Sequence, residues 1–413
     1  IIGAGASGLM AAITAARANM RVVLLEHMDQ AGKKLSATGN GKCNYTNLDL
    51  TIDNYYCKEP DFVKTVFAQF SYMDTIHFYE ELGIRPVQKN GTCIYPESEQ
   101  ASSVKNVLLA EIKRLKIPIL YSVGIRRIHK VHNSHVFEIL TKEKPFYCKA
   151  CILATGGMAA KKTGSDGSGY LYARQLGHTI VPPLPALAAL VAEYNKWKLP
   201  AGVRIECGAA LYVDGKKYAS EHGELQITDY GVSGIVIFQL SRIAAQALES
   251  HRKTEVLLDF KPKMAIEELA DYLQERFQSK YHVHKSAADC LIGFMPDKMI
   301  SVMLKRSEIH ADRSCILCSR KQLLQLAKLI KNYKISIKGI KGFDMAQATS
   351  GGVPVHEIHA ESMESKLVSG LYFAGEMIDV DAKCGGYNLQ WAWSSGYLAG
   401  KCSAAKDDWP NDL

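Results

Sequence analysis

The stretch Gly3-Ala4-Gly5-Ala6-Ser7-Gly8 decides the fold, because it has the G-x-G-x-x-G spacing of a dinucleotide-binding turn. It follows the apolar pair Ile1-Ile2, which is typical of a strand end, and precedes an alanine-rich run from Leu9 to Asn19 with helical composition. In such a turn the first glycine permits the bend, the second lets the backbone approach a pyrophosphate, and the third allows close helix–strand packing. The N–H groups at the start of the helix then face the phosphates.

A second predicted strand, Arg21 to Glu26, completes a β-α-β unit. Its last residue lies 18 positions after Gly8, where a carboxylate can accept hydrogen bonds from both ribose hydroxyls of an adenosine. A carboxylate at this place would repel a 2′-phosphate. The unit therefore indicates FAD or NAD as the ligand and disfavours NADP.

A loop rich in glycine, hydroxyl and amide groups follows, from Gly32 to Asn44. Loops of this length without structure of their own are usually functional. We expect its backbone to run along an extended ligand. The predicted contacts in this loop are Lys34, Thr38, Asn40, Gly41, Cys43 and Asn44. We interpret Cys43 as a small contact residue, because no second cysteine lies close enough in the loop for disulfide chemistry.

Two later segments separate FAD from NAD. A buried strand over residues 371–374 ends in Gly375-Glu376, and an acid there can bind a ribityl hydroxyl, which only the flavin dinucleotide has. Gly385-Gly386 then opens a helix whose N-terminus would stabilise a reduced flavin through its partial positive charge. The predicted contacts are Ala154, Thr155 and Gly156 after an earlier strand, and Gly375, Glu376, Gly386, Tyr387, Asn388 and Leu389 here. Tyr387 is also the candidate proton donor, with plain packing as the alternative role.

The order of these elements predicts an α/β fold with a Rossmann-like FAD-binding domain built from both chain ends. We assign residues 1–185 and 344–413 to this discontinuous domain. The segment between them is expected to form a β-rich subdomain over 186–261, containing a β-barrel, and a helical subdomain over 262–343.

Composition narrows the function further. The 413 residues include 50 Lys and Arg against 42 Asp and Glu, and the basic residues form no run of five or six. We therefore expect no nucleic-acid partner. Eleven dispersed cysteines suit free thiols in a reducing compartment, which predicts a cytoplasmic protein without a metal site. No apolar run reaches the ~18 residues of a membrane span.

Several motifs together resemble the HI0933-like (BaiN-type) family of bacterial NAD(P)/FAD-dependent oxidoreductases. They are Gly32-Lys33-Lys34-Leu35, residues 38–44, Ala154-Thr155-Gly156-Gly157, residues 163–169, residues 349–352, residues 363–367 and residues 385–390. The resemblance spans nearly the whole chain. It implies FAD contacts at Gly3, Gly5, Ser7, Gly8, Glu26, Lys34, Gly41, Cys43, Asn44, Thr155, Gly156, Gly375, Glu376, Asn388 and Leu389; Ala6 lies in the same turn. The chain departs from many relatives at Asp229, where they carry His, and at Ala382, where they carry Gly.

The leading hypothesis is an enzyme that reduces an electron-poor C=C bond of an oxo compound, such as a bile-acid-like enone. NAD(P)H would be a transient co-substrate, because no second G-x-G-x-x-G follows a strand. One alternative is an amine oxidase of the aminoacetone type that uses O₂. Another is a non-catalytic flavin-binding or nucleic-acid-associated protein. The sequence leaves the oligomeric state open.

Overall fold

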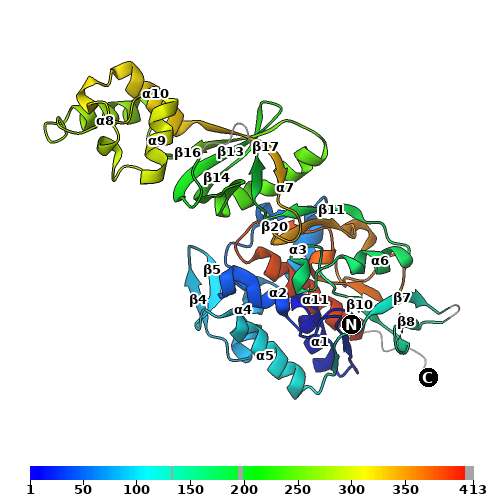
Figure 1. Ribbon diagram of the computed structural model, residues 1–413. Helices are drawn as coiled ribbons and strands as arrows, with labels where there is room; N and C mark the ends of the chain where they lie inside the picture. Colours follow the sequence, from blue (N-terminus) through cyan, green and yellow to red (C-terminus); the bar gives the residue numbers. More distant parts are fainter. Residues whose placement is uncertain (132–133, 194–198, 405–413) are drawn as a thin grey trace. The chain divides into compact units, whose positions relative to one another are not determined.

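The protein consists of two compact units, which we describe separately (Figure 1). The computed structural model describes residues 1–131, 134–193 and 199–404. The first unit combines Ile1–Pro185 with Phe343–Leu413, and the second comprises Ala186–Gly342. Both chain ends therefore contribute to one unit.

A parallel sheet forms the centre of the first unit. Ile2 bridges in parallel to Leu25 on one side and to Leu153 on the other. The sheet continues outward through β1 (Leu24–Leu25) to β6 (Ile119–Leu120), and through β10 (Cys151–Leu153) to β19 (Leu371–Phe373). Strands buried on both faces need continuous apolar runs, and β10 and β19 consist of such buried residues. This short, deeply buried parallel sheet confirms the predicted α/β fold.

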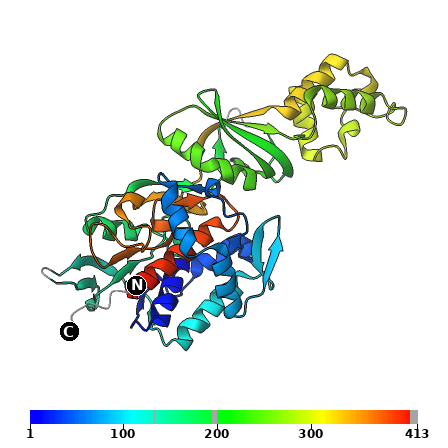
Figure 2. The ribbon, with the colours of Figure 1, turned by 180° about the vertical axis from the view of Figure 1, so that it is seen from behind.

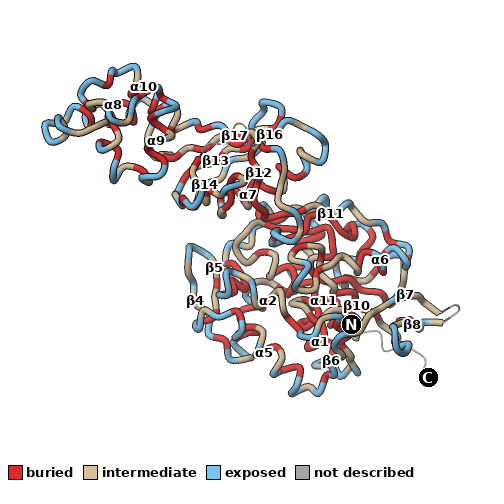
Figure 3. The backbone as a smooth tube through the Cα atoms, viewed as in Figure 1, coloured by how far each residue is buried: buried red, intermediate tan, exposed pale blue. Residues whose placement is uncertain are grey.

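Two glycine-containing helices pack against each other beside this sheet. They are α1 (Ala6–Arg17) and α11 (Tyr387–Ala404). A Cβ added at Gly396 would lie 2.5 Å from the carbonyl oxygen of Ser7, and one at Gly400 would lie 2.4 Å from that of Ala11. The glycines therefore let the two backbones approach closely, and Figure 3 shows this region as largely buried.

The remaining elements of the first unit surround this centre. The helices are α2 (Lys33–Ala37), α3 (Pro60–Gln69), α4 (Tyr72–Glu81), α5 (Ala101–Arg114) and α6 (Ser168–Gln175). Two small sheets have three strands each, in the orders β2 (Thr46–Asn47), β5 (Cys93–Pro96), β4 (Pro86–Lys89) and β7 (Ile125–Lys130), β8 (Phe137–Thr141), β9 (Phe146–Cys148). Two more have two strands each: β3 (Tyr55–Tyr56) pairs with β20 (Asp381–Ala382), and β11 (Val181–Ala186) pairs with β18 (Ala348–Gly352).

The second unit contains a closed six-stranded barrel. Its strands in order are β12 (Leu190–Ala192), β15 (Gly231–Ser233), β14 (Lys216–Ile227), β13 (Arg204–Val213), β16 (Thr254–Asp259) and β17 (Tyr333–Ile340). Two features differ from the sequence-based expectation. The β-rich stretch also contains helix α7 (Ile235–Glu249), whose apolar face packs into the barrel core. The segment 262–343, assigned to the helical subdomain, also contains β17, which completes the barrel because its alternate residues are buried.

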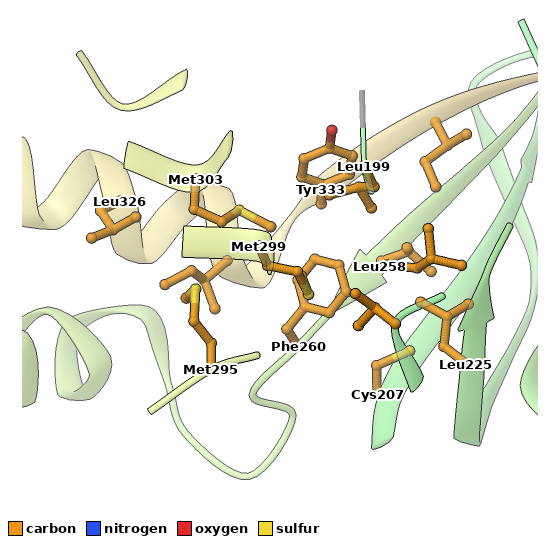
Figure 4. Packing of buried hydrophobic residues seen from close by; sticks show 14 of the residues in the cluster. Leu199, Cys207, Leu225, Leu258, Phe260, Met295, Met299, Met303, Leu326 and Tyr333 are labelled. Carbon is orange, nitrogen blue, oxygen red and sulfur yellow. The ribbon is translucent and has the colours of Figure 1, made fainter. Parts of the chain in front are cut away.

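A helical part extends from one end of the barrel (Figures 1 and 2). It contains α8 (Ile266–Gln278), α9 (Asp297–Arg306) and α10 (Arg320–Lys331). Its core is continuous with that of the barrel, and Figure 4 shows Met299 and Met303 of α9 near Phe260, which follows β16. The helical part and the barrel therefore share one hydrophobic cluster.

Candidate functional site

The glycine turn has the geometry that a bound pyrophosphate needs. A Cβ at Gly3 would lie 2.5 Å from the carbonyl oxygen of Ala154, and one at Gly8 would lie 2.0 Å from that of Gly3. These two glycines are therefore required by the fold itself. Gly5 differs, because a Cβ there would meet no atom within 4 Å. Its backbone therefore borders open space in the cleft, which we call the open lane, and α1 begins directly after Gly5.

The predicted ribose acid stands beside this turn. One carboxylate oxygen of Glu26 accepts a hydrogen bond from the Ala4 N–H at 2.7 Å, and the other accepts one from the Met28 N–H at 2.8 Å. Only 7% of the residue is exposed. The two amides fix the orientation of the carboxylate, and it still borders the cleft, where its remaining lone pairs can accept hydroxyl groups.

Distant segments meet at the carboxylate of Glu376. One of its oxygens lies 2.5 Å from Lys34 Nζ, and the other accepts the Thr349 N–H at 2.8 Å. The Thr349 hydroxyl oxygen in turn accepts the N–H groups of Met158 and Ala159 at 2.8 and 3.0 Å. The structure thus joins the α2 region, the loop after β10 and the C-terminal segment at one place.

A cleft runs past these groups and has about 1240 Å³ of empty space, part of it open to solvent. Among the predicted contacts, thirteen line it: Gly3, Gly5, Ala6, Ser7, Glu26, Lys34, Thr38, Ala154, Thr155, Gly156, Glu376, Asn388 and Leu389. Apolar and polar side chains from other segments line the rest of the cleft. These further lining residues include Val123, Ile125, Thr163, Ser165, Ser168, Tyr172, Gln347, Val380 and Trp391.

The other predicted contacts do not line this cleft. They are Gly8, Asn40, Gly41, Cys43, Asn44, Gly375, Gly386 and Tyr387. Asn40 and Gly41 are exposed. Gly375 supports the site from behind, since its N–H donates to Ser395 Oγ and its carbonyl accepts the Trp391 indole N–H.

Two predicted contact residues are packed into the protein interior. Cys43 is fully buried, and burial raises the pKa of its thiol to about 12. Tyr387 is 7% exposed and lies edge-on to Tyr55, with ring centroids 5.8 Å apart. Burial raises the pKa of the Tyr387 phenol to about 12 as well. Both groups therefore stay protonated at neutral pH.

Sequence reasoning did not single out Val123, Ile125, Tyr172 or Gln347. They come from three separate parts of the chain and belong to no glycine or charge motif. The Tyr172 hydroxyl donates to the Ile125 carbonyl at 3.1 Å, which fixes that wall of the cleft. The run from Thr163 to Gly169, which belongs to the motifs of the family resemblance, also borders the cleft, and Gly164 and Gly167 in it take positive φ.

Comparisons with known proteins agree with this geometry. The family model described as "HI0933-like protein Rossmann domain" matches residues 1–402. A 3-dehydro-bile acid delta(4,6)-reductase of Clostridium scindens is 38% identical over 412 residues, with 98% of each chain covered. A ribosomal RNA dihydrouridine synthase of Haemophilus influenzae is 30% identical over 407 residues, with 96% of each chain covered.

Among solved structures, a 3-ketosteroid delta1-dehydrogenase from Sterolibacterium denitrificans is similar in fold, with a TM-score of 0.52 at 11% identity and 98% coverage of each chain. The fold and cleft define an FAD-dependent oxidoreductase. The chain belongs to the HI0933-like family. In the described part of the chain, no helix is long and apolar enough to cross a membrane.

Proposed function

We propose that the protein is a reductase that saturates a C=C bond conjugated to a carbonyl group, with NAD(P)H as electron donor. The observation that carries this proposal is the open lane over Gly5, bordered by Glu26 at one place and by the Lys34–Glu376 pair at another. The relatives support the reaction type. One relative is named as a delta(4,6)-reductase of a 3-dehydro-bile acid, and the other as a synthase of dihydrouridine, in which a C=C bond of uracil has been saturated.

The residues of the cleft fit FAD. The first N–H groups of α1 would hold the pyrophosphate, and Glu26 would accept the ribose hydroxyls of the adenosine. Glu376 would accept a ribityl hydroxyl. Lys34 would partly offset the negative charge of the phosphates. When bound, FAD would supply hydride transfer to the carbon β to the carbonyl, while the protein orients the reactants.

The α carbon needs a proton, and we propose Tyr387 as its source. The raised pKa keeps the phenol protonated at neutral pH. A substrate would have to reach the start of α11, beyond the residues that line the cleft. There a positioned acid can contribute a factor of about 10²–10⁴ to the rate.

Anaerobic stopped-flow spectroscopy tests the proposal in two halves. NADH or NADPH should bleach the flavin absorbance of the holoenzyme. A 3-oxo-Δ4 steroid should then restore it without oxygen. Absence of bleaching with both nucleotides would remove NAD(P)H from the proposal. Recolouring only by O₂, with peroxide formed from aminoacetone, would replace the reductase with an amine oxidase.

The uracil base of an RNA is a second candidate substrate. The dihydrouridine synthase relative covers this chain almost completely, including the second unit. The charge distribution favours it, because the second unit carries 24 Lys and Arg against 17 Asp and Glu, whereas the first carries 26 against 25. A free oxo compound remains the first candidate, since the bile acid reductase is the more identical of these two relatives.

We also propose a cytoplasmic location. None of the eleven cysteines, all of which lie within the described residues, forms a disulfide bond, and five of them are only partly buried. Exposed thiols persist most readily in a reducing compartment. Fractionation of cells with an antibody against the protein would test this location.

A further inference from the structure

The excess positive charge of the second unit is concentrated on particular helices of its helical part. Helix α8 carries four acids and one arginine, whereas α10 carries four cations and no acid. Two cations of α10 are paired, Arg320 with Asp271 and Lys331 with Asp259. Lys321 and Lys328 have no acidic partner within 4 Å among the described residues. They lie seven positions apart, on one exposed face and roughly 10 Å from each other along the helix axis.

An exposed aromatic and aliphatic surface adjoins the start of this helix. Tyr281 is 72% exposed, and Leu317, four residues before Lys321, is 59% exposed. The two segments are held together by Cys315, whose thiol donates to the His282 carbonyl at 3.0 Å and whose N–H donates to the Lys285 carbonyl at 3.1 Å. An aromatic ring and an aliphatic side chain are therefore both accessible to a ligand beside the start of α10.

Two lysines flank the exposed tyrosine in the sequence. Lys280 Nζ lies 5.2 Å from the centroid of the Tyr281 ring, and Lys285 follows four residues later. Neither lysine has an acidic partner within 4 Å in the described ranges. The surface therefore combines lysines that form no ion pair within 4 Å and one exposed ring, and Asp289 is the acid that interacts electrostatically with Lys285. Lysines and an exposed ring are the elements that bind a flexible polyanion with stacking bases. We call Lys280, Tyr281, Lys285, Leu317, Lys321 and Lys328 the basic patch.

We propose that the basic patch binds RNA. The lysines would contact phosphates, and an unpaired base would stack on Tyr281. This inference rests on the second candidate substrate of the proposed function, and it adds the surface by which an RNA is held. An acidic protein would suit the lysines but gives no role to an exposed ring. The relative named as a ribosomal RNA dihydrouridine synthase favours RNA over an anionic membrane.

Fluorescence anisotropy on the holoenzyme tests this proposal without any turnover. The probe is a labelled RNA hairpin with a uridine-rich loop, and the competitors are a DNA hairpin of the same sequence, phosphatidylglycerol vesicles and polyglutamate. The variant K280E/K285E/K321E/K328E is compared with K58E/K113E/K116E/K142E, which makes the same charge change on exposed lysines of the first unit. A third variant, Y281A, removes the ring alone.

We expect the patch variant to weaken RNA binding at least tenfold, and the control variant less than twofold. The slope of log Kd against log salt should fall by about 0.7 for each single-strand phosphate contact removed. Y281A should weaken binding about fivefold or more, because stacking contributes about 1–3 kcal/mol per base. Equal losses in both lysine variants, or equal competition by vesicles or polyglutamate, would overturn the proposal. Bleaching of the flavin by NAD(P)H is measured in a separate experiment. If the protein proves not to be a reductase, the RNA-binding result can therefore still be interpreted.

Discussion

Lys34 and Glu376 form an ion pair across the cleft wall, with Nζ 2.5 Å from a carboxylate oxygen, although 342 positions separate them in the sequence. About a fifth to a quarter of each side chain is exposed, at 25% and 20%. Pairs this exposed contribute only about 0–1 kcal/mol to folding. The contact therefore indicates a role at the cleft more than a role in stability.

E376Q should weaken FAD binding and leave folding almost unchanged. The amide retains shape but loses the charge that Lys34 and the Thr349 N–H face. We expect Kd for FAD to rise about tenfold, corresponding to about 1.4 kcal/mol. Fluorescence titration of the apoprotein measures this change. A large fall in the melting temperature with unchanged affinity would assign the pair to folding instead.

Gly5 and Gly8 should respond oppositely to added side chains. G5V should fold normally, since φ −81° and ψ −168° suit any residue and nothing occupies the lane. It should purify without flavin, because the isopropyl group would project into the part of the cleft where we expect the pyrophosphate. G8A is the matched control, in which a methyl group meets the Gly3 carbonyl and costs about 1–3 kcal/mol of stability. A yellow G5V protein with normal flavin content would contradict the ligand lane.

Replacing Glu26 by glutamine, which has the same shape, should weaken FAD binding. In E26Q, one of the two backbone donors, Ala4 N–H or Met28 N–H, must face an NH₂ group. That unpaired backbone donor should lower stability. The amide is also uncharged and can accept fewer ribose hydroxyls, and losing a hydrogen bond to a charged acceptor costs about 1.5–3 kcal/mol, so FAD affinity should fall by about 10- to 100-fold. Isothermal titration with FAD measures it. An unchanged affinity would show that the carboxylate does not bind the ribose.

Y387F should separate the two half-reactions. Bleaching of the flavin by NAD(P)H should keep its rate, whereas reoxidation by an enone should slow by about 10²-fold or more, because only the second step needs a proton on carbon. Rapid mixing measures both rates in one protein. Equal effects on both steps would reduce Tyr387 to a packing residue beside Tyr55.

His178 predicts a pH dependence of stability. It bonds to Glu357 at 2.7 Å and to the Ser365 hydroxyl at 2.8 Å, and its side chain is fully buried. Burial lowers the pKa of His178 below its ordinary 6.5, although Glu357 partly opposes this shift. The folded state then binds fewer protons than the unfolded state. The contribution of neutral His178 to the free energy of unfolding is therefore complete above pH 6.5 and is lost as the pH falls below that value.

The matched variant H178Q should be less stable at pH 7.5, by about 1–3 kcal/mol for the broken buried network. Its free energy of unfolding should fall less between pH 7 and pH 5 than that of the parent chain. Urea unfolding at several pH values measures both. Parallel pH curves for the two proteins would show that this histidine does not titrate in that range.

Local patterns carried much of the prediction. The turn from Gly3 to Gly8 specified its strand and helix neighbours within 20 residues, because Gly8 packs against the Gly3 carbonyl inside that unit. The cleft walls at Val123, Tyr172 and Gln347 could not be predicted this way, since they form only after distant segments pack together. Helix α7 was missed because its apolar residues resemble a strand run. The uneven charge of the two units became visible only when their boundaries were known.

The central claim is that the cleft binds FAD, and identifying the bound cofactor tests it most directly. The protein should be purified, its visible spectrum recorded, and the cofactor released by heat and identified by chromatography and mass. The account predicts one FAD per chain, either as purified or after reconstitution. A protein that stays colourless with excess FAD, or one that releases FMN or NAD instead, would contradict it.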